Sequence, residues 1–207
     1  MAGYVLYGYR GSGSAAIEVA MVDCGIPFEF RDVNPETGAL YSEAFRVVNS
    51  RQQVPALMHP DGSVITEVPA ILNHLADAHP QTGLAPKPGT SARAQHDRWL
   101  AFLHANVYEG LLRVIYTERY TTDPTAVYSV RKSAEAYVAR HLGLFGEAIE
   151  EGPFLFGEHP SAVDFLAWVL STWMDPLQVA NASRKVARLA EALRTRTAVS
   201  EVIVSNT

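Results

Sequence analysis

The chain has 207 residues, of which 48% are hydrophobic and 19% charged, and its formal net charge is -5. These values are those of a folded globular protein and exclude an intrinsically disordered chain. The acidic balance, without a basic patch interleaved with aromatic residues, predicts no nucleic-acid partner. The longest strictly apolar stretch, Phe165 to Leu170, is far short of the roughly 20 residues that a membrane-spanning helix needs, so no membrane partner is expected.

Cys24 is the only cysteine, and the chain therefore allows neither an internal disulfide nor a CxxC redox pair. The residues Met1 to Tyr4 do not show the basic region and apolar core of a secretory signal. A cytoplasmic protein is the simplest expectation.

The first 80 or so residues alternate between strand-like and helical patterns. Tyr4 to Tyr7 is predicted to be a strand, and Ala15 to Cys24 a helix that ends at Gly25. Phe28 to Val33 alternates apolar and polar residues, which is the period of a half-buried strand. Because a crossover helix joins these two strands, we expect them to pair in parallel.

A second helix, a hairpin and a third helix follow. Tyr41 to Val48 is predicted to be helical, as is Ala70 to Ala76. Between them, Ala56 to Met58 and Ser63 to Ile65 flank the turn signal Pro60-Asp61-Gly62, so they are predicted to form a hairpin. The resulting order, βαβ-α-ββ-α, predicts a small α/β domain.

The pattern changes at His79 to Gly89, a segment rich in proline and glycine that cannot continue a helix. We therefore expect a first domain over residues 1–79, a linker over 80–90, and an all-α helical bundle over 91–207. Apolar residues in the last region recur three and four positions apart, as in Leu100, Leu103 and Val107. Ser161 and Asp164 have the spacing of a capping box at the start of a helix.

Three segments of the first domain are candidates for binding a ligand. The first is Gln53-Val54-Pro55, immediately before a predicted strand. A proline there most simply marks a strand edge, and this interpretation is favoured by the segment alone. Alternatively, a cis Pro55 turns the Val54 backbone outward, where its N–H and C=O pair with an extended peptide as a further strand does.

The second segment is Thr66 to Leu72, where Pro69 suits the first turn of a helix. Free N–H groups at a helix start attract a ligand carboxylate. Glu67 either caps the helix or receives an amino group beside that carboxylate. A site that offers both functions holds the amino-acid end of a peptide.

The third segment, Tyr7 to Ser14, links the first strand to the first helix, a frequent location of ligand sites in α/β proteins. It contains glycines, but neither GxxxxGK[ST] nor the third glycine of GxGxxG is present. A nucleotide site is therefore not expected.

The order and spacing of these segments resemble the glutathione transferase family, and in particular its bacterial, beta-like members. The resemblance extends from Leu6-Tyr7-Gly8 through Gln53 to Leu57 and Thr66-Glu67 to the capping motif at Ser161 to Asp164. It implies a thioredoxin-like first domain, glutathione as co-substrate without a metal, a small hydrophobic electrophile as second substrate, and a homodimer.

The resemblance also implies roles for individual residues. Val54 would pair with the cysteinyl backbone of glutathione beside a cis Pro55. Glu67 and the N–H of Val68 would hold the γ-glutamyl end, and Gln53 or Arg51 would reach the glycyl carboxylate. Many family members have serine where this chain has Val68, so any hydroxyl contact there is lost.

The family activates the glutathione thiol with a Tyr, Ser or Cys, because the thiolate is the nucleophile. The position of the beta-type cysteine falls on Gly13, which excludes a mixed disulfide there. We place Ser12 first as the donor to the thiolate, Tyr7 second and Ser14 third, against the alternative that each is an ordinary strand or loop residue.

The second substrate is expected at Tyr108, with Tyr116 as a weaker candidate, although aromatic residues on such a helix more often belong to the core. The resemblance leaves other activities open. A glutathione-dependent isomerase or dehalogenase uses the same scaffold, and a non-catalytic glutathione-binding dimeric module is a further alternative. A thiol-disulfide oxidoreductase is disfavoured because no CxxC is present.

Overall fold

The computed structural model of the protein describes residues 3–205. Its internal contacts divide the chain into two units. The sheet unit comprises the residues up to Ala85 together with those from Arg194 onward, and the helical unit comprises Pro86–Leu193. Within residues 3–205, no helix is both long and apolar enough to cross a membrane.

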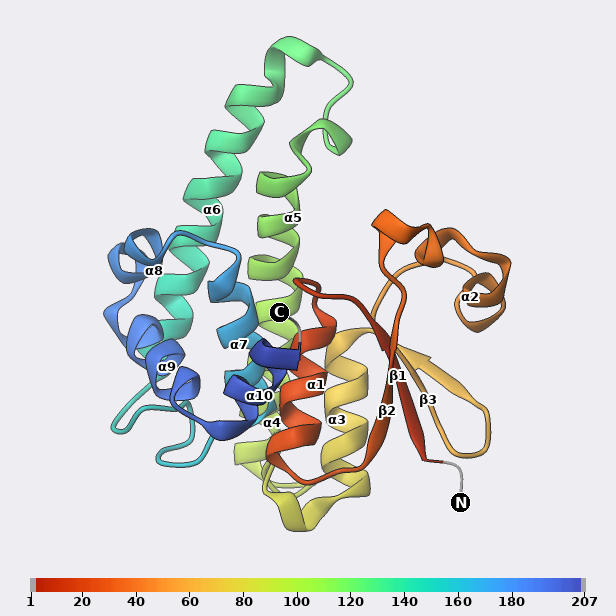
Figure 1. Ribbon diagram of the computed structural model, residues 1–207. Helices are drawn as coiled ribbons and strands as arrows, with labels where there is room; N and C mark the ends of the chain where they lie inside the picture. Colours follow the sequence, from red (N-terminus) through yellow and green to blue (C-terminus); the bar gives the residue numbers. More distant parts are fainter. Residues whose placement is uncertain (1–2, 206–207) are drawn as a thin grey trace. The chain divides into compact units, whose positions relative to one another are not determined.

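The sheet unit is built on a mixed sheet of four strands, in the order β2-β1-β3-β4 (Figure 1). The strands are β1 (Tyr4–Gly8), β2 (Phe28–Asp32), β3 (Ala56–Met58) and β4 (Val64–Thr66). β1 is parallel to β2 and antiparallel to β3, and β3 forms an antiparallel hairpin with β4. Both the parallel pair and the hairpin that the sequence predicts are therefore confirmed.

Helices cover the two faces of this sheet (Figure 1). One face carries α1 (Ser14–Asp23) and α3 (Val68–Ala78). The other carries the short turns η1 (Pro35–Thr37) and η2 (Ala39–Tyr41) and the helix α2 (Glu43–Val48). The sheet unit thus has the predicted thioredoxin-like architecture; its last element before the helical unit is the turn η3 (Pro80–Thr82).

Neighbouring residues of β1 face opposite sides of the sheet because side chains alternate along a strand. Gly8 faces α1, since a Cβ added to it would lie 2.2 Å from Ser14 Oγ. Tyr7 faces α2 and is buried in a cluster that includes Leu40 and Phe45. This alternation decides which side chains of β1 lie near the start of α1.

The last helix, α10 (Thr197–Ser205), packs against α1 within the sheet unit. Arg196 forms a two-pronged ion pair with Asp23 at the end of α1, with both N–O distances 2.8 Å. The sheet unit therefore differs from the expected first domain, 1–79, because it includes the C-terminal segment. The physical reason is that α1 is apolar on most sides, with seven of its ten residues buried, and requires a second cover besides the sheet.

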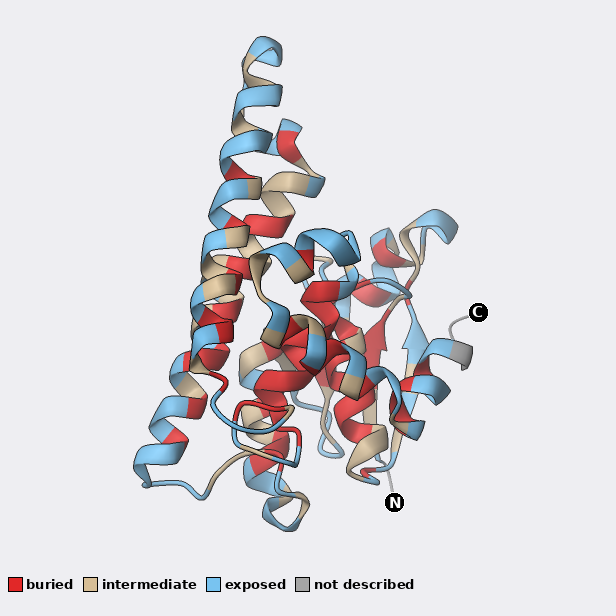
Figure 2. Cartoon of the chain, turned by 90° about the vertical axis from the view of Figure 1, so that its left-hand side faces the viewer, coloured by how far each residue is buried: buried red, intermediate tan, exposed pale blue. Residues whose placement is uncertain are grey.

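The helical unit is all-α, as the sequence predicts. Its long elements are α4 (Ser91–Phe102), the π-helical turn η4 (Leu103–Tyr108), α5 (Glu109–Ile115), α6 (Val127–Ala148), α7 (Ala162–Thr172), α8 (Pro176–Ala182) and α9 (Arg184–Arg194). The short turns η5 (Thr117–Arg119) and η6 (Pro124–Ala126) connect α5 to α6. α6 buries one stripe of residues and leaves the remainder partly or fully exposed, whereas α7 is almost entirely buried (Figure 2).

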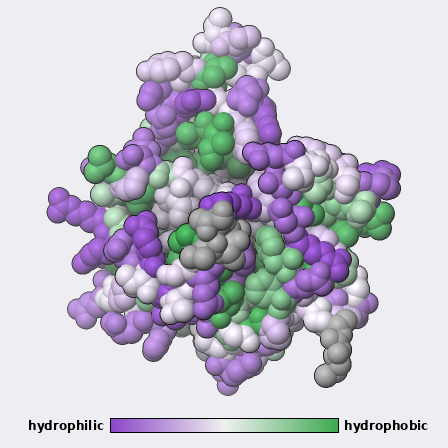
Figure 3. Space-filling view, in the orientation of Figure 1, coloured by the Kyte–Doolittle hydropathy of each residue, from purple (hydrophilic) through white to green (hydrophobic). Residues whose placement is uncertain are grey.

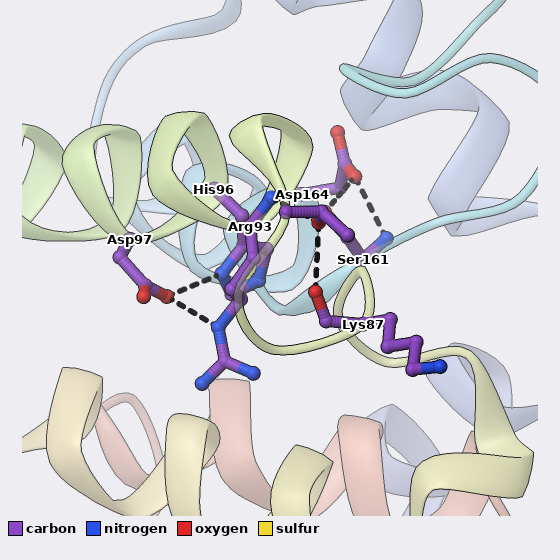
Figure 4. A network of polar contacts seen from close by, with 7 residues as sticks. Lys87, Arg93, His96, Asp97, Ser161 and Asp164 are labelled. Atoms are coloured by element: carbon purple, nitrogen blue, oxygen red, sulfur yellow. Dashed lines mark hydrogen bonds and ion pairs between the residues drawn. The ribbon is translucent and has the colours of Figure 1, made fainter.

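Two polar clusters lie in this unit, one at the start of α7 and the other within α4 (Figure 4). Asp164 accepts hydrogen bonds from Ser161 N–H at 2.8 Å, Ser161 Oγ at 2.7 Å and Leu155 N–H at 2.9 Å, which confirms the predicted capping box. Complete burial raises the pKa of Asp164 from 3.8 to about 6, in spite of these donors. In the second cluster, Asp97 lies 2.8 Å from Arg93 Nε and 3.0 Å from His96 Nδ1.

Candidate functional site

The strand register brings the three candidate segments to one end of the sheet. Tyr7 of β1 is paired with Ala56 of β3, and Ala56 is paired with Thr66 of β4. The loop after β1, the residues before β3 and the residues after β4 therefore all leave the sheet at this end. Neighbouring strands lie about 4.8 Å apart, so the three segments span about 10 Å.

Val54 presents an unpaired backbone at this end. The Val54–Pro55 peptide bond is cis, the isomer that the ligand-binding interpretation of Pro55 requires. Within residues 3–205, neither the N–H nor the C=O of Val54 has a hydrogen-bond partner. The neighbouring Gln53 is exposed, and its carbonyl accepts a hydrogen bond from Asn49 Nδ2 at 2.7 Å. The Val54 backbone thus has the hydrogen-bonding groups of an edge strand.

Glu67 precedes the first residue of α3, but its side chain does not cap the helix. Its Oε1 instead lies 2.8 Å from Nη1 of Arg51, and both side chains are about half exposed. The backbone of Glu67 has φ +69°, a sparsely populated region for a residue with a side chain. The N–H of Val68, the first helical residue, points out of the helix start without an intrahelical acceptor. A carboxylate, a guanidinium and a backbone donor therefore gather at this point.

Ser12 and Ser14 form a hydroxyl pair at the start of α1, with their Oγ atoms 2.8 Å apart. Ser12 Oγ also donates to the carbonyl of Tyr9 at 2.7 Å, and Ser14 Oγ lies 3.5 Å from that same carbonyl. Ser14 is 1% exposed and Ser12 is 7% exposed, so Ser12 is the more accessible of the two. Two hydroxyl donors thus compete for one carbonyl, which leaves one of them able to donate elsewhere.

The side chain of Tyr7 has its own packing and hydrogen-bond partners, which differ from those of the two serines. Its ring packs against Phe45 in the cluster beneath α2, with the ring centres 5.7 Å apart. Its hydroxyl accepts a hydrogen bond from Arg31 Nη1 at 3.0 Å. Sequence reasoning missed Arg31, because the register that pairs Tyr7 with Arg31 across β1 and β2 cannot be read from either strand alone.

Tyr108 and Tyr116 both belong to the helical unit. Tyr108 ends the π-helical turn η4, and its ring lies edge-on to Trp173 with the ring centres 5.0 Å apart. Tyr116 ends α5 and lies under the guanidinium of Arg119, at 4.0 Å. Trp173 was not predicted, since it lies just beyond the apolar run of α7 and carries no pattern of its own.

No group of three or more His, Cys, Asp or Glu side chains suited to a metal ion occurs in the part of the chain that the structure describes. The polar groups gathered at the end of the sheet are hydroxyls, backbone donors and acceptors, one carboxylate and one guanidinium. They suit an extended, zwitterionic peptide.

Comparison with known proteins identifies the relatives of this chain. Residues 2–77 match the family model described as the N-terminal domain of glutathione S-transferase. The uncharacterized GST-like protein YncG of Escherichia coli strain K12 is 31% identical over 170 residues, which cover 81% of this chain and 80% of YncG.

Solved structures give the same result for the fold. A glutathione transferase homolog from Sulfitobacter with bound glutathione has a TM-score of 0.87 and 22% identity, over 99% of both chains. A sphingomonad glutathione S-transferase complexed with glutathione has a TM-score of 0.81 and 26% identity, over 98% of both chains. Because the Sulfitobacter protein is only 22% identical to this chain, its similarity concerns the fold alone.

Proposed function

Since the chain belongs to the glutathione S-transferase family, we propose that it is a transferase that adds the thiolate of glutathione to a small hydrophobic electrophile. The observation that carries this proposal is the unpaired backbone of Val54, which lies between the Ser12–Ser14 hydroxyl pair and the Arg51–Glu67 pair at one end of the sheet.

The proposed ligand fits this end of the sheet in length and charge. A tripeptide in extended form is about 10 Å long, which is the distance that the three segments span. Its cysteinyl N–H and C=O pair with the backbone of Val54 as a further strand does. Its γ-glutamyl ammonium binds Glu67, and the carboxylate beside it binds the N–H of Val68 at the positive end of α3. Arg51 supplies a cation for the glycyl carboxylate of the tripeptide, and Gln53 is the other candidate for this contact.

The thiol then lies near the start of α1, where we assign its activation to Ser12. Ser12 Oγ–H turns from the Tyr9 carbonyl to the sulfur, and Ser14 Oγ–H, which is 3.5 Å from that carbonyl, takes its place. A hydrogen bond to a charged group contributes about 1.5–3 kcal/mol. Because each pKa unit corresponds to about 1.4 kcal/mol, Ser12 lowers the thiol pKa by about one to two units from its free value near 8.5.

The reaction that follows is a nucleophilic addition or substitution. The thiolate sulfur forms a bond to the electrophilic carbon, and the electron pair of the broken bond leaves with the departing group or moves onto an acceptor that solvent protonates. Isomerisation and dehalogenation begin with the same thiolate, so they share every step up to this bond.

The proposal is tested by titrating the ultraviolet absorbance of the thiolate of bound glutathione against pH. We expect a bound pKa below 7.5, a return toward the free value in Ser12→Ala, and no change in Tyr7→Phe, because the Tyr7 side chain faces α2 and not the start of α1. A shift in Tyr7→Phe alone would transfer the role to Tyr7. Binding with an unshifted pKa would support the non-catalytic module, and absence of binding would reject the proposed site.

We further propose that the transferase works in the cytoplasm, where thiols remain reduced, and acts as a homodimer. Tyr41 and Val47, beside and within α2, are 67% and 80% exposed, and large apolar side chains in this state favour an interface. Sedimentation equilibrium measures the mass directly, and a value near the 22.6 kDa of one chain would reject the dimer.

A further inference from the structure

A buried asparagine, Asn49, begins the loop that leads from α2 to Val54. The surface over α2 mixes hydrophobic and hydrophilic side chains (Figure 3), among them the exposed Val47 and the exposed pair of Glu43 and Arg46. Asn49, which directly follows α2, is by contrast only 8% exposed. Buried polar groups in proteins have hydrogen-bond partners, so the partners of Asn49 indicate what this residue does.

Both the main chain and the side chain of Asn49 bind the protein around them. Its N–H donates to the carbonyl of Phe45 at 2.8 Å, and its C=O accepts from the N–H of Gln52 at 2.9 Å. Its side-chain Oδ1 accepts from the N–H of Arg51 at 3.1 Å. Its Nδ2 donates to the carbonyl of Gln53 at 2.7 Å. The loop therefore wraps around the side-chain amide of Asn49.

A further hydrogen bond fastens the same loop from the other side. Gln52 has φ +49°, a value that residues with a side chain seldom adopt. Its Nε2 donates to the carbonyl of Leu40 at 3.2 Å. Strained backbone of this kind persists only where the surrounding structure imposes it, so the conformation of the loop is closely defined.

The hydrogen bond from Asn49 to Gln53 also fixes the direction of the Val54 N–H. The carbonyl of Gln53 and the N–H of Val54 belong to one peptide unit, which is planar and, unlike the Val54–Pro55 bond, trans. In a trans peptide the C=O and the N–H point in opposite directions. Because the buried Asn49 binds the C=O, the N–H is directed outward. The same hydrogen bond polarises the peptide unit and strengthens the N–H as a donor.

We propose that Asn49 is a positioning residue of the glutathione site, and that its side-chain amide aims the Val54 N–H at the cysteinyl carbonyl of glutathione. The inference rests on the proposed function, which pairs that carbonyl with Val54. Asn49 itself does not touch the ligand, because it acts through the peptide unit of Gln53 and Val54. It therefore sets the affinity for glutathione and leaves the activation of the thiol to Ser12.

The test compares three ligands by isothermal titration calorimetry on the full chain. Glutathione and γ-glutamylcysteine have an acceptor oxygen at the cysteinyl carbonyl, whereas γ-glutamylcysteamine lacks this group. Asn49→Asp keeps the acceptor for the Arg51 N–H but places an oxygen against the carbonyl of Gln53, so the peptide unit turns away. Since one hydrogen bond is lost, the first two ligands should bind about tenfold more weakly. γ-Glutamylcysteamine should bind equally to both chains.

Two variants control for charge and folding. Asn34→Asp makes the same chemical change elsewhere in the sheet unit, where Oδ1 of Asn34 accepts from the N–H of Glu36 at 2.8 Å and an aspartate does the same. It should leave all three affinities unchanged. Asn49→Ala removes the donor without adding a charge and should show the same selective losses, and it replaces Asn49→Asp if that variant does not fold.

Two further measurements separate positioning from a purely structural role. At saturating glutathione, the bound thiol pKa should be the same in the Asn49 variants and the unmodified chain, whereas general loosening of the site would raise it. In the unmodified chain, the NMR signal of the Val54 amide proton should move downfield with glutathione and γ-glutamylcysteine but not with γ-glutamylcysteamine.

The outcomes distinguish this inference from the proposed function. Equal losses for all three ligands, no loss in a folded Asn49 variant, or a raised thiol pKa would overturn the role of Asn49 and leave the proposed function in place. Absence of glutathione binding to the unmodified chain would overturn both.

Discussion

Arg51 Nη1 lies 2.8 Å from Glu67 Oε1 at the end of the sheet, although 16 positions separate the two residues in the chain. The pair is about half exposed, and ion pairs in that state add only about 0–1 kcal/mol to stability. Its stabilising value therefore does not explain the positive φ of Glu67, a conformation that costs about 1–3 kcal/mol. The proposed ligand-binding role of Glu67 would account for both features, since it requires the carboxylate to lie at this point.

Glu67→Gln tests that role. The substitution keeps the size and backbone of the residue and removes only its charge, so the fold should be unaffected. Because a hydrogen bond to a charged group contributes about 1.5–3 kcal/mol, glutathione should bind about 10- to 150-fold more weakly, as measured by calorimetry. Glu43→Gln is the matched control, since Glu43 forms a comparable exposed pair with Arg46 on α2. Equal losses in the two variants would contradict a specific role for Glu67.

Gly8 and Ser14 are fitted to each other in the same region, and Gly8→Ala should disturb the hydroxyl pair. The added Cβ would lie 2.2 Å from Ser14 Oγ and 2.5 Å from Ser14 Cβ, so the start of α1 must shift. Overpacking of this kind costs about 1–3 kcal/mol. Chemical denaturation should show this loss, and the bound thiol pKa should rise.

Gly8→Ala combined with Ser14→Gly should recover part of the lost stability, because the second change removes both atoms that clash. Gly3→Ala serves as the control, since its added Cβ would lie 4.0 Å from the nearest atom, a carbonyl oxygen. Additive effects of the two substitutions would show that Gly8 and Ser14 do not share space.

Much of the sheet unit could be predicted from local patterns. The alternation in Phe28 to Val33 and the Pro-Asp-Gly turn predicted β2 and the hairpin, because strand period and turn chemistry are local properties. The orientation of Tyr7 was not predicted. The strand alternation fixes that Tyr7 and Gly8 face opposite ways, but which face carries α1 depends on packing. Sequence alone therefore left Tyr7 and Ser12 as competing donors.

The C-terminal segment shows a second limit of local patterns. Residues 197–205 are rich in β-branched residues, which have low helix propensity, and nothing in them indicates that they form a helix that returns to α1. The partner that defines their position, Asp23, lies 173 positions from Arg196. Long-range pairing of this kind depends on the three-dimensional path of the chain, so local patterns place residues 197–205 in the expected helical domain, 91–207, whereas their contacts group them with the sheet unit.

Arg196→Met should therefore loosen α10. It leaves Asp23, whose side chain is only 14% exposed, without its two-pronged partner. Loss of one partner costs about 3–5 kcal/mol for a fully buried pair and less for one that reaches solvent, so we expect about 2 kcal/mol. Hydrogen exchange should accelerate over 197–205 before the sheet is affected. Asp23→Leu combined with Arg196→Met should recover part of the loss, and no recovery would mean that the pair itself is not what holds the helix.

Asp164 provides the final prediction, on how stability depends on pH. Burial raises its pKa from 3.8 to about 6, so between these values the folded state binds more protons than the unfolded state. The free energy of unfolding that Asp164 contributes therefore falls as pH rises from about 4 to about 6 and stays lower above that. At about 1.4 kcal/mol per pH unit, the fall amounts to about 3 kcal/mol.

Asp164→Asn isolates this contribution. Asparagine does not ionise, but its amide nitrogen replaces one of the two carboxylate oxygens and therefore faces the N–H group of either Leu155 or Ser161, so the variant should be less stable. Only the unmodified chain has a buried carboxyl group that ionises as pH rises, and this ionisation lowers its free energy of unfolding. The difference in free energy of unfolding between the unmodified chain and the variant should therefore be largest near pH 4 and shrink by about 3 kcal/mol by pH 7. Other carboxyl groups titrate equally in both proteins and cancel in the difference. A difference that stays constant across this range, measured by urea denaturation at each pH, would show that the three donors outweigh burial and keep Asp164 ionised.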